Sequence, residues 1–472
     1  MRVDHGIVEL IEDGARIHLM GIGGAGMAGL GTLAQALGAA VDGCDLEPGA
    51  AARGLLDRGI VVQKGHGPEH VRDCAAVIHT AAVPDDHAEL QAARARGIPV
   101  VKRSRAMADL VSVGEVIAVG GTHGKTTTTT LVALALEAAN LNPTALVGGR
   151  VPGWDGNALI GGRDTFVVEA DEYDRSFLDL WPKVAVVTSV EAEHLDTYET
   201  LTELEKAFDE FVERVPEDGR VVACADDAGA RRRLETAGDR GLAYGLGEDA
   251  DLRAVGIEHE LHGTRFTVRW CGDSVGEFEL ALSGQHNLRN ALAAIGVMLA
   301  LGLEPSVAAP ALARFEGVER RFQLIGEAGG VTVIDDYAHH PTEVAATLET
   351  ARRTFAGRRL LAAFQPHLYS RTQAFADEFG RVLAAADLVF VTAIYPAREP
   401  PIPGVTAHLV VEAARELIEA DRVRETANLD ELFEALRAEL RAGDVLITMG
   451  AGDVFQVAHR VARELEGSHV DA

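Results

Sequence analysis

A short glycine- and threonine-rich segment, set between an apolar run and a helical stretch, constrains the fold more than any other feature of this sequence. Residues 116–119 predict a strand and residues 128–139 predict a helix. The segment between them consists of Gly120, Gly121, Thr122, His123, Gly124, Lys125, Thr126 and Thr127. In such a loop the backbone N–H groups surround phosphates, Lys125 neutralises the β- and γ-phosphates, and Thr126 reaches Mg²⁺. We therefore predict that residues 120–127 bind ATP.

The loop departs from the standard phosphate-loop pattern at one position. Val119 stands five residues before Gly124, where that pattern has a glycine. A buried lysine between a strand and a helix nevertheless needs an anion, so a loop without a ligand is the weaker hypothesis.

The alternation of strand and helix recurs along the chain and predicts parallel sheets. Short apolar runs predict strands at residues 16–20, 75–79, 99–101, 165–168, 184–187, 220–224, 331–334, 360–364, 388–391 and 445–448. Residues 250–282 alternate with period two and predict an antiparallel hairpin, whereas 27–38 and 287–301 predict helices. A length of 472 residues suits three domains of roughly 150 residues each. We expect an α/β fold with three domains, at 1–107, 108–319 and 320–472.

Composition and charge exclude several classes of partner. The formal net charge of −28 repels nucleic acid and anionic membranes, so we expect neither as a partner. Four cysteines lie far apart without a C-x-x-C pair, which favours reduced thiols over a disulfide framework or a zinc site. The first residues lack the apolar core of a signal peptide, and no apolar run reaches the roughly 20 residues of a membrane span. We expect a soluble cytoplasmic protein, either a monomer or a homodimer.

A second glycine-rich turn follows the predicted strand at 16–20. It fits the pattern G-x-G-x-x-G and contains Gly21, Gly23, Gly24 and Gly26. Asp45 lies 19 residues beyond Gly26, where an acidic side chain meets a ribose hydroxyl. Small residues and the N-terminus of the following helix favour a diphosphate. Any ligand with a pyrophosphate group suits this turn, a UDP-sugar or NAD alike, and a plain structural turn is the alternative.

Acidic residues and a histidine follow the strands next to the phosphate loop. Glu169 directly follows the strand predicted at 165–168, where its carboxylate suits Mg²⁺ alongside Thr126. A solvated acidic strand end is the alternative. His194 follows the strand at 184–187 and is a candidate metal ligand, although a lone histidine is more often a structural hydrogen-bonding residue.

The pattern G-T-x-G-K-T-T at residues 121–127 resembles the phosphate loop of the Mur ligases and of their relatives, the folylpolyglutamate synthases. His123 in the variable position resembles two branches of the family, one that adds L-alanine and one that recycles a tripeptide. The resemblance extends over nearly the whole chain. It implies a Rossmann-like UDP-binding domain at the N-terminus, a central P-loop ATPase-like domain and a Rossmann-like C-terminal domain.

The resemblance also implies roles for the residues of the metal region. It implies the metal ligands Thr126, Glu169 and His194. It implies the catalytic residues Lys125, Glu169 and His194. The asparagine and aspartate that are usual upstream of His194 are Ser189 and Glu193 here, which changes the reach of both side chains.

A segment before the helix at 287–301 resembles the part of the family that binds adenine and ribose. It contains His286, Asn287 and Asn290. An asparagine offers a donor and an acceptor that match a purine edge, and helix capping by Asn287 is the alternative. Arg321 is implied to contact the ATP phosphates and Asp336 the ribose. A structural ion pair is the alternative for the two adjacent arginines at 320 and 321.

Two segments after strands of the third sheet resemble the alanine-adding branch. They are residues 336–343 and 364–372, and the carboxyl edge of such a sheet is where ligands bind. Arg371 is the candidate for the amino-acid carboxylate, because its planar guanidinium pairs bidentately. Some members have a second arginine where this chain has Leu368. The implied amino-acid-binding residues are Tyr337, His339, His340 and Arg371.

The resemblance thus implies an ATP-dependent ligase with Mg²⁺ as cofactor. Its expected substrates are UDP-N-acetylmuramate and L-alanine, joined through an acyl phosphate on the lactyl carboxylate. The implied UDP-sugar-binding residues are Gly21, Gly23, Gly24, Gly26, Asp45 and Thr80. Selectivity among alanine, serine and glycine stays open, as does the base that deprotonates the amine.

Three other functions remain as alternatives. The tripeptide-recycling ligase shares the histidine-bearing loop, but residues 336–343 and 364–372 favour the alanine-adding type. An NAD-linked oxidoreductase that binds its cofactor at residues 16–45 is the second alternative, but it gives Lys125 and Glu169 no functional role. A nucleotide-switched binding protein would bind Mg-ATP without turnover.

Overall fold

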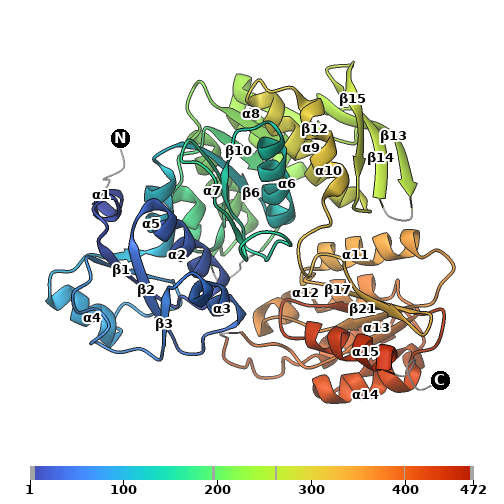
Figure 1. Cartoon of the computed structure of the whole chain (residues 1–472). Coiled ribbons are helices and arrows are strands. Elements are labelled where there is room, and N and C mark those ends of the chain that lie inside the picture. The colour runs from blue at the N-terminus through green and yellow to red at the C-terminus, as the bar shows by residue number, and fades with distance from the viewer. Residues whose placement is uncertain (1–5, 194–196, 261–262, 398, 468–472) are drawn as a thin grey trace. The chain divides into compact units, whose positions relative to one another are not determined.

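The computed structural model describes residues 6–193, 197–260, 263–397 and 399–467. Three sheets alternate with helices over these residues, which agrees with the predicted α/β class (Figure 1). The chain divides into two compact units. Unit 1 comprises Met1–His259, Gly263–Leu282 and Asn287–Glu316, and unit 2 comprises Glu260–His262, Ser283–His286 and Gly317–Ala472.

The first sheet of unit 1 has five parallel strands in the order β3-β2-β1-β4-β5. The strands are β1 (Arg16–Met20), β2 (Ala40–Asp45), β3 (Val61–Lys64), β4 (Ala76–His79) and β5 (Val100–Lys102). The helices of this region are α1 (Gly6–Glu12), α2 (Ala25–Leu37), α3 (Ala50–Asp57), α4 (Ala88–Ala95) and α5 (Arg103–Val111). The predicted strands at 16–20, 75–79 and 99–101 fall on β1, β4 and β5. Strands β2 and β3 were not predicted, because polar residues and a glycine interrupt their apolar pattern.

The second sheet of unit 1 has ten strands in the order β15-β14-β13-β12-β11-β10-β6-β9-β7-β8. They are β6 (Glu115–Gly120), β7 (Thr144–Leu146), β8 (Ala158–Leu159), β9 (Thr165–Glu169), β10 (Val184–Val187), β11 (Arg220–Cys224), β12 (Gly241–Gly245), β13 (Leu252–Glu260), β14 (Gly263–Trp270) and β15 (Asp273–Leu280). The strands β10, β6 and β9 are parallel neighbours, so their carboxyl ends lie at one edge. β14 pairs antiparallel with β15, which confirms the hairpin predicted within residues 250–282.

The helices around the second sheet are α6 (Lys125–Ala138), α7 (Leu201–Glu213), α8 (Ala228–Ala237), α9 (Gln285–Ala300) and α10 (Ala309–Arg314). Helix α6 begins at Lys125, three residues before the predicted start. Its threonine run is buried, yet Thr129 Oγ1 donates to Lys125 O and Thr130 Oγ1 donates to Thr126 O, each at 2.8 Å. Because these two hydroxyls bond to carbonyls of their own helix, Thr129 and Thr130 pack in the core with their donors paired.

The sheet of unit 2 has six strands in the order β16-β17-β21-β18-β19-β20. They are β16 (Gln323–Ala328), β17 (Val331–Asp336), β18 (Leu360–Phe364), β19 (Leu388–Val391), β20 (Val423–Glu425) and β21 (Val445–Met449). Among the described strands of this sheet, only β16 pairs antiparallel, with β17. The sequence analysis missed β16, which is half exposed, and the short β20.

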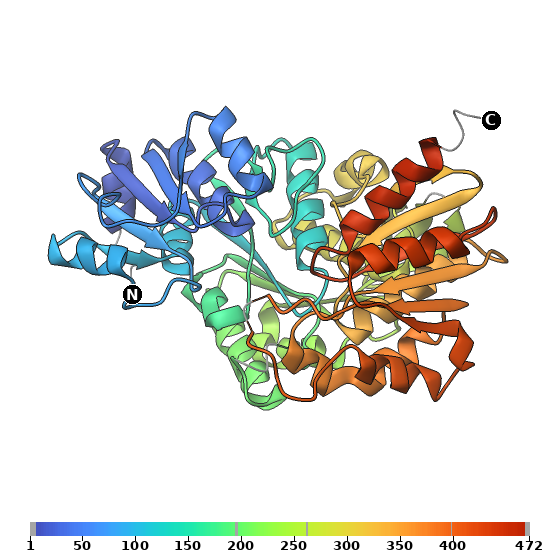
Figure 2. The same ribbon diagram turned by 90° about the horizontal axis from the view of Figure 1, so that it is seen from below.

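Helices cover both faces of this third sheet (Figures 1 and 2). They are α11 (Pro341–Thr354), α12 (Tyr369–Leu383), α13 (His408–Arg415), α14 (Leu429–Glu439) and α15 (Phe455–Gly467). Apolar residues of α11, α12 and α13 form one buried cluster with the sheet, and those of α14 and α15 form another on the opposite face. Unit 2 therefore has a hydrophobic core of its own on each side of its sheet.

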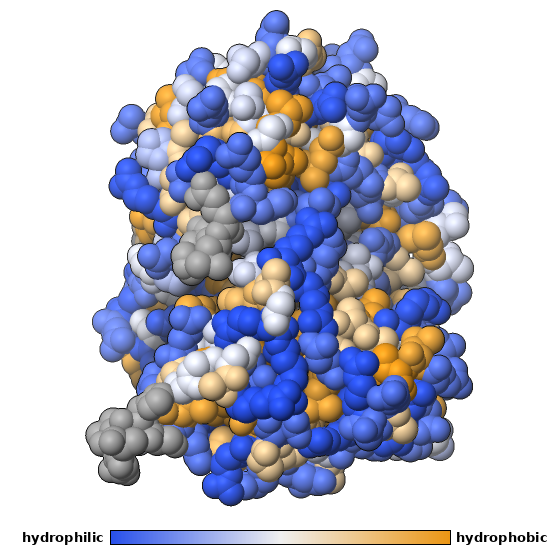
Figure 3. Space-filling view, turned by 90° about the vertical axis from the view of Figure 1, so that its right-hand side faces the viewer, coloured by the Kyte–Doolittle hydropathy of each residue, from blue (hydrophilic) through white to orange (hydrophobic). Residues whose placement is uncertain are grey.

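Hydrophilic residues dominate the face drawn in Figure 3, and hydrophobic residues lie there in small separate groups. Among the described residues, no helix combines the length and apolar character needed to cross a bilayer. All four cysteines are free thiols, of which Cys271 is exposed and the others are buried.

Candidate functional site

The phosphate loop joins β6 to α6, and the segment after β10 fixes its backbone. Thr122 N–H donates to Ser189 O at 2.9 Å, and His123 N–H donates to Ser189 Oγ at 3.0 Å. Thr188 Oγ1 donates to His123 O at 2.6 Å. Ser189, which stands where the resembling family has asparagine, thus holds the loop through both its carbonyl and its hydroxyl.

Two loop glycines occupy positions that a side chain would not fit. Gly121 has φ +134°, and a Cβ atom on it would lie 2.0 Å from Thr188 Oγ1. Gly124 precedes α6 with φ +78°, and its Cβ would lie 2.6 Å from Asn290 Oδ1. These close approaches require glycine and keep the loop backbone against its neighbours.

Lys125 starts α6, and a carboxylate already faces its ammonium group. Lys125 Nζ lies 2.9 and 2.8 Å from the two carboxylate oxygens of Glu172, which is fully buried. It also donates to Gly121 O at 2.6 Å. Burial alone would lower the pKa of Lys125, but Glu172, Asp171 and Glu169 raise that pKa above its usual value. The lysine therefore stays cationic at the phosphate loop.

Glu172 is a site residue that the sequence analysis did not single out. Glu172 belongs to residues 169–172, Glu-Ala-Asp-Glu, which begin at the last residue of β9. Of these four residues, only Glu169 was predicted to bind the metal ion. Its backbone carbonyl accepts a hydrogen bond from Tyr198 Oη at 2.7 Å, which fixes the turn. The acidic four-residue segment was the sequence signal for Glu172. The buried ammonium group of Lys125 requires a carboxylate such as this one.

Glu169 lies at the end of β9 with its carboxylate beside the phosphate loop. Its Oε2 accepts hydrogen bonds from Thr126 Oγ1 at 2.9 Å and from Gly148 N at 2.6 Å. Burial raises the pKa of Glu169, and Lys125 with the two hydrogen bonds opposes that rise without cancelling it. The structure brings together the predicted pair Thr126 and Glu169. The third predicted metal ligand, His194, lies outside the described residues.

Asn287 and Asn290 of α9 complete this region of unit 1. Asn290 Oδ1 accepts a hydrogen bond from Thr128 Oγ1 at 3.1 Å, and Asn290 Nδ2 donates to Asn287 Oδ1 at 3.4 Å. Asn290 thus lies against the first turn of α6 and the phosphate loop, although 162 residues separate it from Thr128. Thr127, also predicted, is buried in the same turn.

The second glycine turn joins β1 to α2, and Asp45 and Thr80 lie beside it. Gly23 N–H donates to Asp45 Oδ2 at 2.9 Å. A Cβ atom on Gly21, which has φ +80°, would lie 2.8 Å from Thr80 Cγ2. Gly24 is the residue before α2, so the helix N-terminus opens at this turn. The structure brings together Gly21, Gly23, Asp45 and Thr80, predicted UDP-sugar residues at the carboxyl ends of β1, β2 and β4.

Two further residues lie at this turn and were not predicted. Arg103 Nη1 lies 3.1 Å from the position of a Cβ atom on Gly26. Asn157 Nδ2 donates to Ala25 O at 2.9 Å and to Val147 O at 2.8 Å. Asn157 thereby ties the start of α2 to the second sheet. Neither residue belongs to a sequence motif, so only the fold reveals them.

In unit 2, Asp336 ends β17 and is held by the backbone. Its carboxylate accepts hydrogen bonds from Phe322 N at 2.8 Å and Ala338 N at 2.7 Å. Burial raises the pKa of Asp336 to about 6, against the opposing effects of Arg321 and the backbone hydrogen bonds. A buried carboxyl group is costly to ionise, and the two backbone N–H groups offset part of that cost.

The two adjacent arginines of unit 2 have different environments. Arg320 contacts Asp335 Oδ2 at 3.0 Å and donates to the carbonyls of Gly450 and Gly452 at 2.6 and 3.0 Å. Arg320 therefore forms a structural ion pair with Asp335, which was the alternative interpretation of the two adjacent arginines. Arg321 Nη1 lies 3.6 Å from Glu343 Oε1, and its guanidinium lies 5.2 Å from the centre of the Tyr337 ring.

The predicted amino-acid residues form two groups in unit 2. His339 Nδ1 lies 3.0 Å from Tyr337 O, and the His339 ring meets the His367 ring edge-on. Arg371 is buried, with Nη1 3.0 Å from His367 Nδ1. His367, which lies within the predicted segment 364–372, thus links His339 to Arg371.

His340 and His286 of unit 2 have local contacts of their own. His340 caps α11, where its side chain accepts a hydrogen bond from Thr342 N at 3.4 Å and Glu343 completes a capping box. His286 opens α9, and its Cε1 lies 2.7 Å from the position of a Cβ atom on Gly284. The capping contact fixes the imidazole of His340 at the start of α11.

Three family models match the chain and together span most of it. The Mur ligase family catalytic domain matches residues 16–114, and the Mur ligase middle domain matches 119–298. The Mur ligase glutamate ligase domain matches residues 320–452.

Curated relatives match over nearly the whole length. A UDP-N-acetylmuramate–L-alanine ligase from Nitratidesulfovibrio vulgaris is 44% identical over 444 residues, which cover 94% of this chain and 97% of that protein. An enzyme of the same name from Anaeromyxobacter is 44% identical over 440 residues, 93% of this chain and 95% of that protein.

Two solved structures also match nearly the whole chain. A UDP-N-acetylmuramate–alanine ligase from Thermotoga maritima superposes with a TM-score of 0.82 at 28% identity, over 96% of this chain and 100% of that one. A murein peptide ligase from Psychrobacter arcticus gives a TM-score of 0.70 at 25% identity, over 96% and 99%.

Proposed function

The chain belongs to the Mur ligase family, and from this premise we propose that it joins L-alanine to the lactyl carboxylate of UDP-N-acetylmuramate in peptidoglycan precursor synthesis. The reaction consumes ATP, the nucleotide that this family uses, and releases ADP and phosphate. The curated relatives with this activity in their names support the choice of substrates, since they align over nearly the whole chain.

One observation in the structure carries the proposal. Lys125, Thr126 and Glu169 meet at the carboxyl ends of β6 and β9, beside a loop whose glycines keep backbone N–H groups free of side chains. A cationic lysine, a hydroxyl and a carboxylate at a helix N-terminus form an arrangement that suits the phosphates of a nucleotide.

The chemistry follows from the charges that these residues bear. A carboxylate oxygen of the sugar attacks the γ-phosphorus of ATP, the bond to ADP breaks, and an acyl phosphate forms. Lys125 neutralises the negative charge that builds up on the transferred group. The amine of alanine then attacks the acyl carbon, and the bond to phosphate breaks as the amine loses a proton.

The residues present fit a magnesium ion. Thr126 Oγ1 and Glu169 Oε2, 2.9 Å apart, offer the hard oxygen atoms that Mg²⁺ prefers. We propose that these two residues hold it, with His194 as a third ligand. When bound, the ion would offset phosphate charge during transfer.

The remaining roles are proposals of the same kind. The turn at 21–26 with Asp45 and Thr80 would bind the UDP-sugar, because it combines a helix N-terminus with side-chain-free backbone. In unit 2, Arg321 and Asp336 would contact the nucleotide and Arg371 the carboxylate of alanine. We expect activity in the cytoplasm, where ATP is available and free thiols such as those of this chain persist.

A phosphate-release assay tests the proposal. The full chain receives Mg-ATP, UDP-N-acetylmuramate and, in separate reactions, L-alanine, L-serine, glycine or the recycled tripeptide. We expect the highest kcat/KM with L-alanine, because the family branch and the relatives agree on it. A preference for the tripeptide would favour the recycling ligase, and nucleotide binding without turnover would favour a switched binding protein.

Substitution of the loop lysine gives the matched test of the site. Lys125→Ala removes the cation at the phosphates, and we expect kcat to fall at least about 100-fold. Lys206→Ala, on the exposed face of α7, removes the same charge and should leave kcat unchanged. Near-normal turnover in Lys125→Ala would refute the site assignment.

A further inference from the structure

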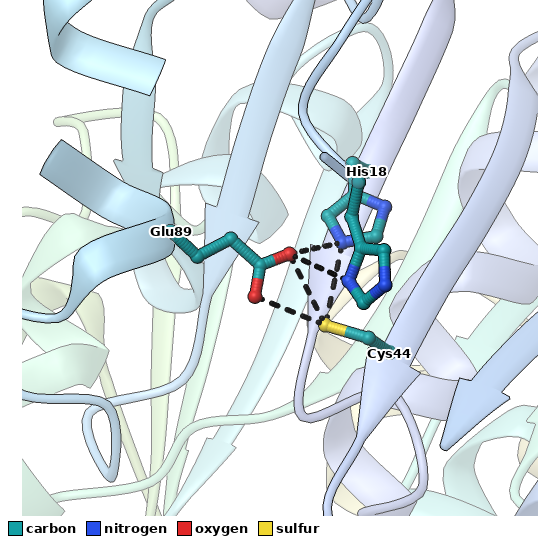
Figure 4. A group of neighbouring side chains, drawn as sticks. His18, Cys44 and Glu89 are labelled. Carbon is teal, nitrogen blue, oxygen red and sulfur yellow. Dashed lines mark hydrogen bonds and ion pairs between the residues drawn. The ribbon is translucent and has the colours of Figure 1, made fainter. Parts of the chain in front are cut away.

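A buried group of metal-binding side chains lies in the first sheet of unit 1, on the face that α4 covers. His18 of β1, Cys44 of β2, His70 after β3 and Glu89 of α4 each offer one ligand atom, and these atoms lie within 4.8 Å of one another. His18, Cys44 and Glu89 are fully buried. In Figure 4, Glu89 reaches from its helix toward Cys44 and His18.

The distances between the ligand atoms lie within or slightly below those around a tetrahedral zinc ion. His18 Nε2 lies 3.0 Å from Glu89 Oε1 and 3.3 Å from Cys44 Sγ. Glu89 Oε1 also lies 3.1 Å from His70 Nδ1 and 3.5 Å from Cys44 Sγ. With bonds to zinc of 2.0–2.3 Å, neighbouring ligands are roughly 3.3–3.8 Å apart. Small movements would therefore suffice to complete the coordination.

The orientation of His18 is the second observation that points to a cation. Its Nδ1 lies 2.5 Å from Asp42 Oδ1, and Arg16 pairs with the other oxygen of Asp42 at 2.5 Å. The proton on Nδ1 therefore points to Asp42, which leaves Nε2 directed at Glu89 and Cys44. Metal-binding histidines typically donate their other N–H to a carboxylate in this way. Nε2, the carboxylate of Glu89 and the sulfur of Cys44 thus face one another at one point, where a cation can bind all three.

We propose that His18, Cys44, His70 and Glu89 bind one Zn²⁺ ion, and that Asp42 orients His18. A thiolate with two imidazoles suits zinc, whereas Mg²⁺ and Ca²⁺ favour all-oxygen sites. Binding displaces the thiol proton of Cys44 to solvent, so one bond to hydrogen is replaced by one to the metal. Four protein ligands without an open position make this a structural site.

The site would stabilise the strand that carries a predicted substrate contact. Cys44 directly precedes Asp45, whose carboxylate accepts the hydrogen bond from Gly23 N–H. A metal ion here would join β1, β2, the segment around His70 and α4 into one rigid group beside the glycine turn. The cysteine spacing alone predicted no zinc site, because only Cys44 takes part and its partners lie 26 to 45 residues away.

Cobalt spectroscopy of the full chain tests the proposal without reference to ligase activity. The protein is treated with chelator, freed of it and titrated with Co²⁺. We expect one equivalent to bind with a thiolate-to-cobalt charge-transfer band in the near ultraviolet, and Zn²⁺ to displace it. Absence of that band in the folded wild type would overturn the proposal.

Matched cysteine variants identify the ligand. Cys44→Ser should lose the charge-transfer band, whereas Cys74→Ser, a buried thiol of the same region outside the group, should keep it. A band that survives in Cys44→Ser would also overturn the proposal.

A second variant covers the case in which Cys44→Ser does not fold. Asp42→Asn retains every proposed ligand, and we expect it to weaken Zn²⁺ binding by about 10–100-fold while the cobalt band remains. Zinc affinity equal to that of the wild type in this variant would contradict the orienting role of Asp42. Magnesium added at the same concentration should produce no band in any variant.

Discussion

At the scale of single residues, the ion pair between Lys125 and Glu172 holds the lysine at the phosphate loop without a nucleotide. The lysine was predictable because its motif is local and lies between a strand and a helix. Glu172 was not, because 47 residues separate it from Lys125 and only the fold brings them together. Thr126, Glu169 and Asn290 were predicted: Thr126 lies in contact with Glu169, and Asn290 lies in contact with Thr128 of the same helix.

The Lys125–Glu172 pair predicts how a neutral variant will respond to nucleotide. Glu172→Gln leaves a buried lysine without its carboxylate, which costs about 3–5 kcal/mol of the free energy of unfolding. ATP phosphates then replace the missing charge, so Mg-ATP should raise the unfolding temperature more in the variant than in the wild type. Differential scanning fluorimetry with and without Mg-ATP measures this difference.

An exposed pair provides the control for this prediction. Glu210 lies 3.0 Å from Arg175, with both side chains about half exposed, so Glu210→Gln should change stability little. Its response to Mg-ATP should equal that of the wild type. Equal responses in Glu172→Gln and Glu210→Gln would contradict the account of the loop.

The buried carboxyl group of Asp336 predicts a pH dependence of stability. Its pKa is about 6 in the folded protein and 3.8 as the reference for the unfolded chain. Between these values the folded state holds the proton more tightly, so this group lowers the free energy of unfolding as pH rises. Below pH 3.8 it imposes no cost, and above pH 6 the full cost is roughly 3 kcal/mol.

Urea unfolding of the wild type and of Asp336→Asn between pH 4 and pH 7 measures this effect. The variant loses a backbone hydrogen bond at every pH, so only the change with pH is informative. We expect the free energy of unfolding of the wild type, relative to that of the variant, to fall from pH 4 to pH 6 and to level off above pH 6. A constant difference would show that Asp336 ionises normally.

At the scale of elements, the strand–loop–helix unit of β6, the phosphate loop and α6 was predicted almost completely. Its apolar run, glycines and helix formers are adjacent in the sequence, so local physics determines them. The strands β2, β3, β7, β8, β12, β16 and β20 were missed, because each is short, polar, interrupted by glycine or at the side of a sheet. Such strands are stabilised by pairing with neighbours, which no local pattern records.

The loop geometry predicts unequal costs for two glycine substitutions. Gly121→Ala places a Cβ atom 2.0 Å from Thr188 Oγ1 at φ +134°, so the loop must move. Gly153→Ala has φ +83° but open space around it, so it costs only the backbone strain of about 1–2 kcal/mol. We expect Gly121→Ala to weaken Mg-ADP binding more than tenfold, and Gly153→Ala to leave it unchanged. Calorimetric titration measures both, and equal affinities would contradict the fixed loop.

At the scale of the whole molecule, the three sheets follow the chain order in which the sequence placed three α/β regions. The boundaries at 107 and 319 stay predictions, because the structure divides into two compact units rather than three. Sequence patterns indicate strands and helices, but they do not indicate which sheets belong to one compact unit. The zinc-binding group was hidden for a related reason, since its members are up to 71 residues apart.

The core of unit 2 predicts that it folds by itself. Both faces of its sheet are covered by its own helices, so a fragment of residues 317–467 should unfold cooperatively. A fragment of residues 323–467 lacks Arg320, which joins Asp335 to the carbonyls of 450 and 452, and should be less stable. Circular dichroism during heating distinguishes the two, and a gradual transition in the longer fragment would contradict this prediction.

The central claim is that this chain activates a sugar carboxylate by phosphoryl transfer at the loop that contains Lys125. The most direct test uses UDP-N-acetylmuramate labelled with ¹⁸O in its lactyl carboxylate, together with Mg-ATP and L-alanine. Mass spectrometry of the released phosphate should find one labelled oxygen atom, carried over from the acyl phosphate. Phosphate released in step with amide formation but without label would contradict the account.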